Sequence, residues 1–368
     1  MFKKAPSAWA KRSTNQDSSL HQLSPYIGKL KPRIARDLIL KYSNPGELVV
    51  DPFCGSGTVP LEAMLQGRAA LATDESLYAY VLTKAKLAPP STEALALKAL
   101  DRTLTLALSR PPPDLRQVPA WVRQFFHPQT LRDAIRFANE CIAKKETFLL
   151  ACFLGILHHQ RPGFLSYPSS HLVPYLRNKN FPPDEFPEMY KPRQLHPRLK
   201  AKIQRAFARM MSPGEPTTTL VRRSRIENLS IPTNTDVIIT SPPYMNALDY
   251  KRDNRLRLWF LDNSVDSYFP EPTDRRASFQ RMMKCLLDRA AESLKTRGHL
   301  ILIIGETITR KRITSHPSSL FLEMVNNQKA FSLIEAVRDT IPDIRRSRRD
   351  YRGTKTEHVL VFQRMPSK

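Results

Sequence analysis

A short apolar run, residues 48–50, leads directly into the segment Asp51-Pro52-Phe53-Cys54-Gly55-Ser56-Gly57-Thr58, and a helical pattern follows over residues 60–66. Glycines at alternate positions let the chain turn sharply and bring bare backbone close to a ligand. The helix after the turn directs unpaired N–H groups toward polar or anionic groups. Asp74 follows the next apolar run, where nucleotide-binding folds hold ribose hydroxyls. These features predict a strand, turn and helix that bind a nucleoside cofactor.

Further apolar runs at residues 69–72, 237–240, 300–304 and 358–362 are typical of buried strands. Helical patterns lie between several of them. This alternation predicts an α/β fold with a mainly parallel sheet.

The alternation stops between about residue 89 and residue 212. Helical stretches are expected there at 92–108, 129–158 and 199–211, separated by proline-rich loops. We therefore expect an α/β domain built from residues 1–90 and 216–368, with a helical insertion at 91–215.

The chain carries 58 Lys and Arg against 34 Asp and Glu, a net charge of +24. This surplus favours a polyanionic partner, and nucleic acid is preferred over an anionic membrane surface or general solubility. No two of the four cysteines form a CxxC pair, so neither a zinc site nor a disulfide framework is expected. No apolar run approaches the ~20 residues that span a bilayer. A reducing, cytoplasmic location is expected, associated with the nucleoid when the protein is bound to DNA.

A second motif, Thr240-Ser241-Pro242-Pro243-Tyr244, ends the run at residues 237–240. Two consecutive prolines stiffen the backbone and offer carbonyls without competing N–H donors. Such rigid acceptors suit a planar amine, and Tyr244 provides a flat face on which a base can stack.

Together the two motifs resemble those of the S-adenosylmethionine-dependent DNA amino-methyltransferases, which act on cytosine N4 or adenine N6. The resemblance covers about residues 20–90 and 218–364, where residues 24–26 resemble the cover of the cofactor's methionine end. Residues 341–349 with 357–362 resemble the closing antiparallel hairpin. The resemblance implies a Rossmann-like class I methyltransferase fold with a mainly parallel seven-stranded sheet.

The resemblance also implies roles for individual residues. Ser241, Pro242, Pro243 and Tyr244 would form the catalytic pocket for a flipped base. The methyl group would pass directly from sulfonium to nitrogen, without a covalent enzyme intermediate. S-adenosylmethionine would be held by the glycine-rich turn, by the carboxylate that follows the next strand and by the covering segment, residues 24–26. The residues concerned are Tyr26, Asp51, Phe53, Cys54, Gly55, Ser56, Gly57, Thr58 and Asp74.

Basic residues near these motifs are candidates for contact with DNA phosphates. They are Lys251, Arg252, Arg345, Arg346, Arg348 and Arg349. In related enzymes an insertion often recognises the target, so part of residues 115–211 is a candidate for that role. A cognate restriction endonuclease or a defence-system complex is a candidate partner.

Several functions stay open at this stage. Ser241 can donate a hydrogen bond to a cytosine ring acceptor, which an ionised aspartate could not do, so N4-methylcytosine is the preferred product. Adenine N6 is the alternative. Further alternatives are methylation of an RNA base and a catalytically idle DNA-binding subunit. Methylation at cytosine carbon 5 is disfavoured because no cysteine follows a proline.

Overall fold

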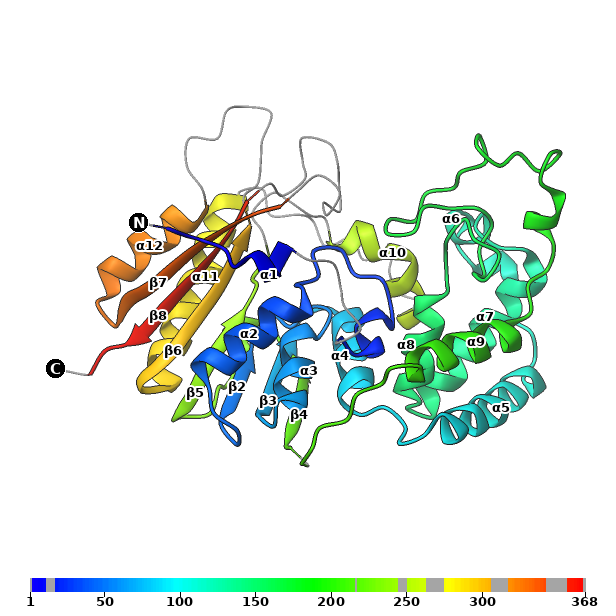
Figure 1. The fold of residues 1–368 in the computed structure, drawn as a ribbon. Coiled ribbons are helices and arrows are strands. Elements are labelled where there is room, and N and C mark those ends of the chain that lie inside the picture. Colours follow the sequence, from blue (N-terminus) through cyan, green and yellow to red (C-terminus); the bar gives the residue numbers. More distant parts are fainter. Residues whose placement is uncertain are drawn as a thin grey trace.

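A computed structural model describes residues 2–10, 17–215, 217–243, 250–262, 275–305, 317–341 and 356–366. Within them an eight-stranded sheet has the order β1-β7-β8-β6-β5-β2-β3-β4 (Figure 1). Strand β8 is antiparallel to both β6 and β7, and every other neighbouring pair is parallel. The strands are β1 (Lys3–Lys4), β2 (Leu48–Asp51), β3 (Ala69–Asp74), β4 (Thr219–Arg223), β5 (Thr235–Thr240), β6 (Leu294–Gly305), β7 (Phe331–Thr340) and β8 (Thr356–Arg364).

This order confirms the predicted fold class, and one detail differs from the expectation. The sheet has one strand more than the expected seven, because β1 pairs with the edge strand β7. Two lysines carry no apolar pattern from which a strand could be predicted. The described antiparallel pair consists of β7 and β8, and most of the segment 341–349 that resembles the hairpin lies outside the described residues. Much of β7 is only partly buried, so it lacks a continuous apolar run.

Helices cover both faces of the sheet because the strand side chains alternate between them. On one face Val49, Val237 and Ile301 pack against α2 (Pro32–Tyr42) and α3 (Thr58–Leu65). On the other face Val50 and Ile238 pack against α11 (Arg275–Ser293) and α12 (Pro317–Gln328). The result is a three-layer α/β/α arrangement with the carboxyl ends of the central strands at one edge.

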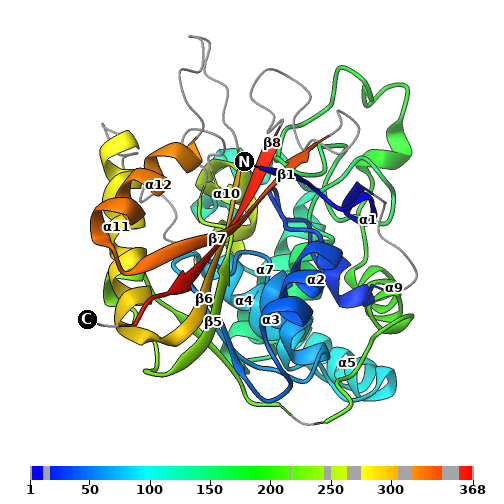
Figure 2. The same ribbon diagram turned by 60° about the vertical axis from the view of Figure 1, so that its left-hand side comes forward.

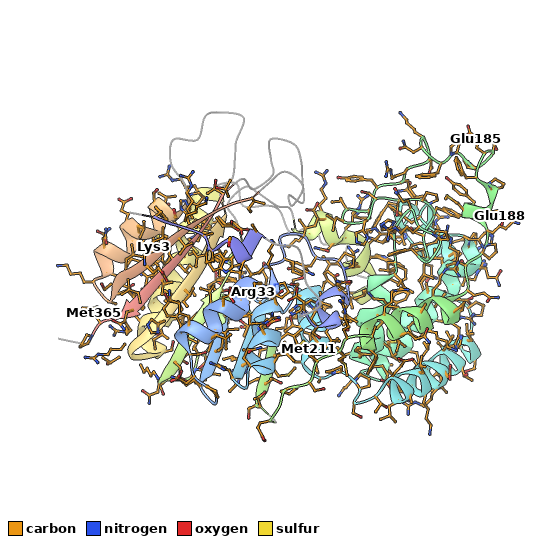
Figure 3. The ribbon with its side chains drawn as sticks, viewed as in Figure 1. Lys3, Arg33, Glu185, Glu188, Met211 and Met365 are labelled. Carbon is orange, nitrogen blue, oxygen red and sulfur yellow. The ribbon has the colours of Figure 1, made fainter. Side chains whose placement is uncertain are left out.

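The segment between α4 (Leu77–Leu87) and β4 is helical and lies to one side of the sheet (Figures 1 and 2). Its helices are α5 (Glu93–Ser109), α6 (Ala120–Arg123), α7 (Pro128–Ala143), α8 (Thr147–Gly155) and α9 (Leu195–Phe207). They share one apolar core with α4 and with α10 (Tyr250–Leu261). Glu185 and Glu188 mark the end of this segment farthest from the sheet, and Lys3 and Met365 lie on the opposite side of the molecule (Figure 3).

The helical stretch expected at 129–158 is two helices, α7 and α8. Lys145 between them has a φ of 57°, which no helix accommodates. None of the helices in the described part of the chain is long and apolar enough to cross a membrane.

Candidate active site

The turn after β2 depends on two glycines in the left-handed region, Gly55 with a φ of 47° and Gly57 with a φ of 72°. A Cβ on Gly57 would lie 2.7 Å from Oγ1 and 3.0 Å from Cα of Thr83, a residue of α4. Gly57 is therefore required both for its backbone conformation and for the close approach of α4. It also caps α3, whose first N–H groups face this turn.

Asp74, at the end of β3, holds the turn through its carboxylate. Its Oδ2 accepts a hydrogen bond from the Gly55 N–H at 2.9 Å, and its Oδ1 accepts one from the Ser76 N–H at 2.9 Å. Burial is the main cause that raises the pKa of Asp74 to about 6. The adjacent Glu75 is exposed and lies 3.6 Å from Arg225, so Asp74 is the acid that faces the glycine-rich turn.

A direct hydrogen bond joins the two sequence motifs. The Thr240 hydroxyl at the end of β5 donates to Oδ1 of Asp51 at the end of β2, over 2.6 Å. The Phe53 N–H donates to the same oxygen at 3.2 Å. Strands β2 and β5 are neighbours at the point where the strand order reverses, the usual ligand site of open α/β sheets. Burial raises the pKa of Asp51 to about 7.

Tyr26 lies against the turn, and Tyr78 of α4 anchors the segment that carries it. The Tyr78 hydroxyl donates to the Pro25 carbonyl at 2.5 Å and is 2.6 Å from the Ser24 hydroxyl. The rings of Tyr26 and Tyr78 stack with centroids 5.7 Å apart. A Cβ on Gly55 would lie 3.2 Å from the Tyr26 ring. The structure thus brings residues 24–26 to the glycine-rich turn.

Other residues of the turn make contacts with α4 or with one another. The buried Cys54 thiol lies 3.5 Å from the Thr83 hydroxyl, and the hydroxyls of Ser56 and Thr58 are 3.1 Å apart. The amine of Lys86, buried in α4, donates to the Ser56 carbonyl at 2.5 Å. Burial lowers the pKa of Lys86 well below its usual range. Phe53 packs against the core under the sheet.

The proposed catalytic motif is described only in part. Ser241 is half-buried, Pro242 is buried and Pro243 is exposed, whereas Tyr244 lies outside the described residues. Lys251 and Arg252 are exposed on α10, where the Arg252 Nε donates to the Tyr175 hydroxyl at 3.0 Å. The arginine run is also outside the described residues, namely Arg345, Arg346, Arg348 and Arg349.

Residues 5–84, which contain the covering segment, the glycine-rich turn and Asp74, match the N6/N4 family described as DNA methylase. Over these residues the chain is similar to this family.

Two relatives agree with this family. A type II methyltransferase of Methanocaldococcus jannaschii, M.MjaII, is 31% identical over 68 residues, which cover 18% of this chain and 13% of that protein. A type II methyltransferase of Kocuria varians, M.MvaI, is 23% identical over 289 residues, covering 69% of this chain and 60% of that protein. The chain thus matches less than two thirds of the length of either relative.

The solved structures that align with the chain are distant. A SAM-dependent methyltransferase from Methanosarcina mazei is 10% identical, with 92% of this chain and all of that chain aligned at a TM-score of 0.37.

Three residues of the candidate site lie outside the two motifs or at their edge and are not predicted from the sequence. Thr240 begins the second motif, and a hydroxyl that ends a buried apolar strand is a signal that could indicate its role. Lys86 and Tyr78 lie in α4 among apolar residues. A lysine and a tyrosine in such a helix are typical of its solvent-exposed surface. Their roles depend on the packing of α4 under the turn, which sequence spacing does not reveal.

The raised pKa of Asp51 predicts a specific dependence of stability on pH. In the unfolded chain this carboxyl ionises near pH 4, whereas in the folded protein it stays protonated until about pH 7. The folded state therefore loses stability as the pH rises from about 4 to about 7, and no further loss follows above that. Asp51→Asn should gain free energy of unfolding relative to wild type across this window. Urea denaturation of both proteins at several pH values tests it, and a difference that does not change with pH contradicts it.

Proposed function

We propose that the protein transfers a methyl group from S-adenosylmethionine to an exocyclic amine of a base in DNA, and that the base is cytosine, methylated at N4. The observation that carries this proposal is the Thr240–Asp51 hydrogen bond, because the two motifs then begin side by side at the carboxyl ends of neighbouring strands. The match of residues 5–84 to the N6/N4 family described as DNA methylase supports the reaction class.

The residues at the turn suit this cofactor. Gly55 and Gly57 leave backbone uncovered, and Asp74 supplies carboxylate oxygens that can accept from ribose hydroxyls. Tyr26 lies on the side from which the methionine end would be covered. When bound, the cofactor supplies an electrophilic methyl group on a sulfonium. Since that group is strongly reactive, the protein's task is chiefly to orient the amine.

The motif that ends β5 would orient the amine. The hydroxyl of Ser241 and the carbonyl of Pro242 would accept its hydrogens, which leaves the nitrogen lone pair free to point at the methyl group. Tyr244 would stack on the base after the base leaves the duplex. Thr240 keeps this motif at a fixed distance from the turn through its bond to Asp51.

Cytosine is preferred to adenine for a chemical reason. A hydroxyl at position 241 can both donate and accept, so it can bind a ring acceptor of cytosine as well as the amine. Adenine N6 remains the second candidate, because the matched family includes both activities.

The product decides between these two. DNA lacking methylation is incubated with the purified protein and labelled cofactor, digested to nucleosides and analysed by mass spectrometry. We expect N4-methylcytosine. N6-methyladenine alone would overturn the choice of base and leave the reaction class standing, and no labelled nucleoside would contradict the enzyme assignment. RNA incubated in parallel tests that substrate.

Asp74 should make cofactor binding depend on pH. Because its pKa is about 6, lowering the pH from 8 to 5 protonates the carboxylate and should weaken S-adenosylmethionine binding about tenfold. Asp74→Asn should bind weakly at pH 8, by the loss of charge-assisted bonds worth about 1.5–3 kcal/mol each, and its affinity should change little with pH. Calorimetric titration measures both. If the affinity of the variant changes with pH as much as that of wild type, the pH dependence comes from the cofactor itself. Glu75 would then be the next candidate for the ribose contact.

The remaining assignments concern DNA. We propose that Lys251, Arg252 and the arginine run contact DNA phosphates. We also propose that the helical insertion at 91–215, which separates the two parts of the methyltransferase domain in the sequence, contributes to recognition of the target site. The excess of positive charge and the position of α10 beside the catalytic motif support this. A cognate endonuclease or another defence protein is a further proposed partner, supported by the similarity to type II methyltransferases.

A further inference from the structure

Arg257 is a buried cation at the junction of three parts of the protein. It lies in α10, which starts shortly after the catalytic motif, and only 1% of its surface is exposed. Among the described residues, the hydrogen bonds of Arg257 go to carbonyl and amide oxygens and not to a carboxylate. A buried cation without an acid partner costs stability, and an apolar side chain of similar size would avoid that cost. Its presence calls for a role other than stability.

The contacts of Arg257 lead first to the insertion. Its Nε donates to the Leu154 carbonyl of α8 at 3.3 Å, and its Nη1 donates to the Leu172 carbonyl at 3.5 Å. Two other arginines of α10 reach the same loop, since Arg252 contacts the Tyr175 hydroxyl and Arg255 donates to the Pro174 carbonyl at 3.3 Å. Helix α10 and the loop at 172–175 are therefore held together by three side chains.

On its other side Arg257 contacts the cofactor turn indirectly. Its guanidinium lies 5.6 Å from the centre of the Tyr78 ring, a cation–π geometry. Tyr78 in turn bonds to Ser24 and Pro25 and stacks on Tyr26, which lies against Gly55. A continuous series of contacts thus runs from the glycine-rich turn through Tyr78 and Arg257 to α10 and the insertion.

We propose that Arg257 is a positioning residue that couples occupation of the cofactor site to DNA binding by α10 and the insertion. A ligand in the turn would fix Tyr26 and Tyr78, and thereby fix Arg257 and the loop at 172–175 in the arrangement that DNA binds. This inference rests on the proposed function, because it requires both ligands. Since binding linkage is reciprocal, DNA must tighten cofactor binding by the same factor.

The test measures that factor with S-adenosylhomocysteine, which cannot donate a methyl group. Its dissociation constant is determined by calorimetry with and without an excess of unmethylated plasmid DNA. In wild type, DNA should tighten binding at least about fivefold, the lower end of common coupling factors. Arg257→Met should reduce the factor below about twofold while binding of S-adenosylhomocysteine alone stays near wild type. A merely structural role would weaken binding alone as well.

Arg193→Met is the matched control. Arg193 is also buried and bonded to carbonyls, those of Phe164 at 2.7 Å and Met189 at 2.8 Å, but in the described residues it contacts neither α10 nor Tyr78. It should keep the full factor. Tyr78→Phe removes the hydrogen bonds to Ser24 and Pro25 but keeps the aromatic ring beside Arg257. If Arg257→Met does not fold, this variant tests the same series of contacts between the glycine-rich turn and α10.

The outcomes separate the two proposals. Full coupling in Arg257→Met or in Tyr78→Phe overturns the role of Arg257, as does a wild-type protein that methylates DNA without any coupling. A wild-type protein that binds neither S-adenosylhomocysteine nor DNA overturns the proposed function itself, and the coupling with it. Loss of coupling in both variants, with the control unchanged, supports the role.

Discussion

Gly57→Ala should abolish most S-adenosylmethionine binding and destabilise the fold. An alanine at a φ of 72° costs about 1–2 kcal/mol, because the left-handed region crowds Cβ against the next carbonyl. The new Cβ would also lie 2.7 Å from Oγ1 and 3.0 Å from Cα of Thr83. Since the second of these atoms is backbone, α4 or the turn must shift, at about 1–3 kcal/mol for such overpacking. The turn is where the cofactor is proposed to bind, so affinity should fall at least tenfold, roughly the effect of 1.4 kcal/mol.

Gly46→Ala is the matched control for this substitution. Gly46 has a φ of 84°, and a Cβ there would meet no atom within 4 Å. It should show the conformational cost alone in urea denaturation, with normal calorimetric titration of the cofactor. If Gly57→Ala binds S-adenosylmethionine as tightly as Gly46→Ala does, the turn is not the cofactor site.

Gly155→Ala should cause a large loss of stability. Gly155 ends α8, and its Cβ would lie closer than 3.0 Å to the carbonyl oxygen of Leu23. Alanine is favoured over glycine in a helix by about 1 kcal/mol, but this gain is outweighed because a backbone oxygen has to move. We expect a net loss of about 2–3 kcal/mol, near the upper end of overpacking costs.

The measurement is again the free energy of unfolding, compared with Gly163→Ala. A Cβ on Gly163 would meet nothing within 4 Å, so that variant should differ little from wild type. Equal stability of the two variants would mean that α8 and the segment at Leu23 separate easily. Because Leu23 precedes the segment that carries Tyr26, Gly155→Ala should weaken cofactor binding as well.

The sequence predicts the parts of this protein that depend on local chemistry. The strand before Asp51, the glycine-rich turn and the acid at Asp74 lie where their patterns indicate. Each of these is encoded within a few residues, by an apolar run, by glycine's backbone freedom or by a polar residue at a strand end.

What could not be predicted is decided by contacts between distant segments. The bond between Thr240 and Asp51 requires the register of two strands far apart in the sequence. Strand β1 exists only because β7 offers it an edge. The basic sequence of α10 is typical of an exposed helix, yet Arg257 within it is buried. It is buried because the carbonyls that accept its hydrogen bonds come from the insertion.

The pairing of β2 with β5 has to wait until the segment between them has been synthesised. Leu48 of β2 bonds to Asp236 of β5 across 188 residues of sequence. At about 5–20 residues per second, the ribosome adds that length in about 10–40 s. During this interval β2 has β3 on one side and an unpaired edge on the other. The helices from α5 to α9 are complete before β5 emerges, so their shared core with α4 can form first and shield the half-built sheet from pairing with other chains.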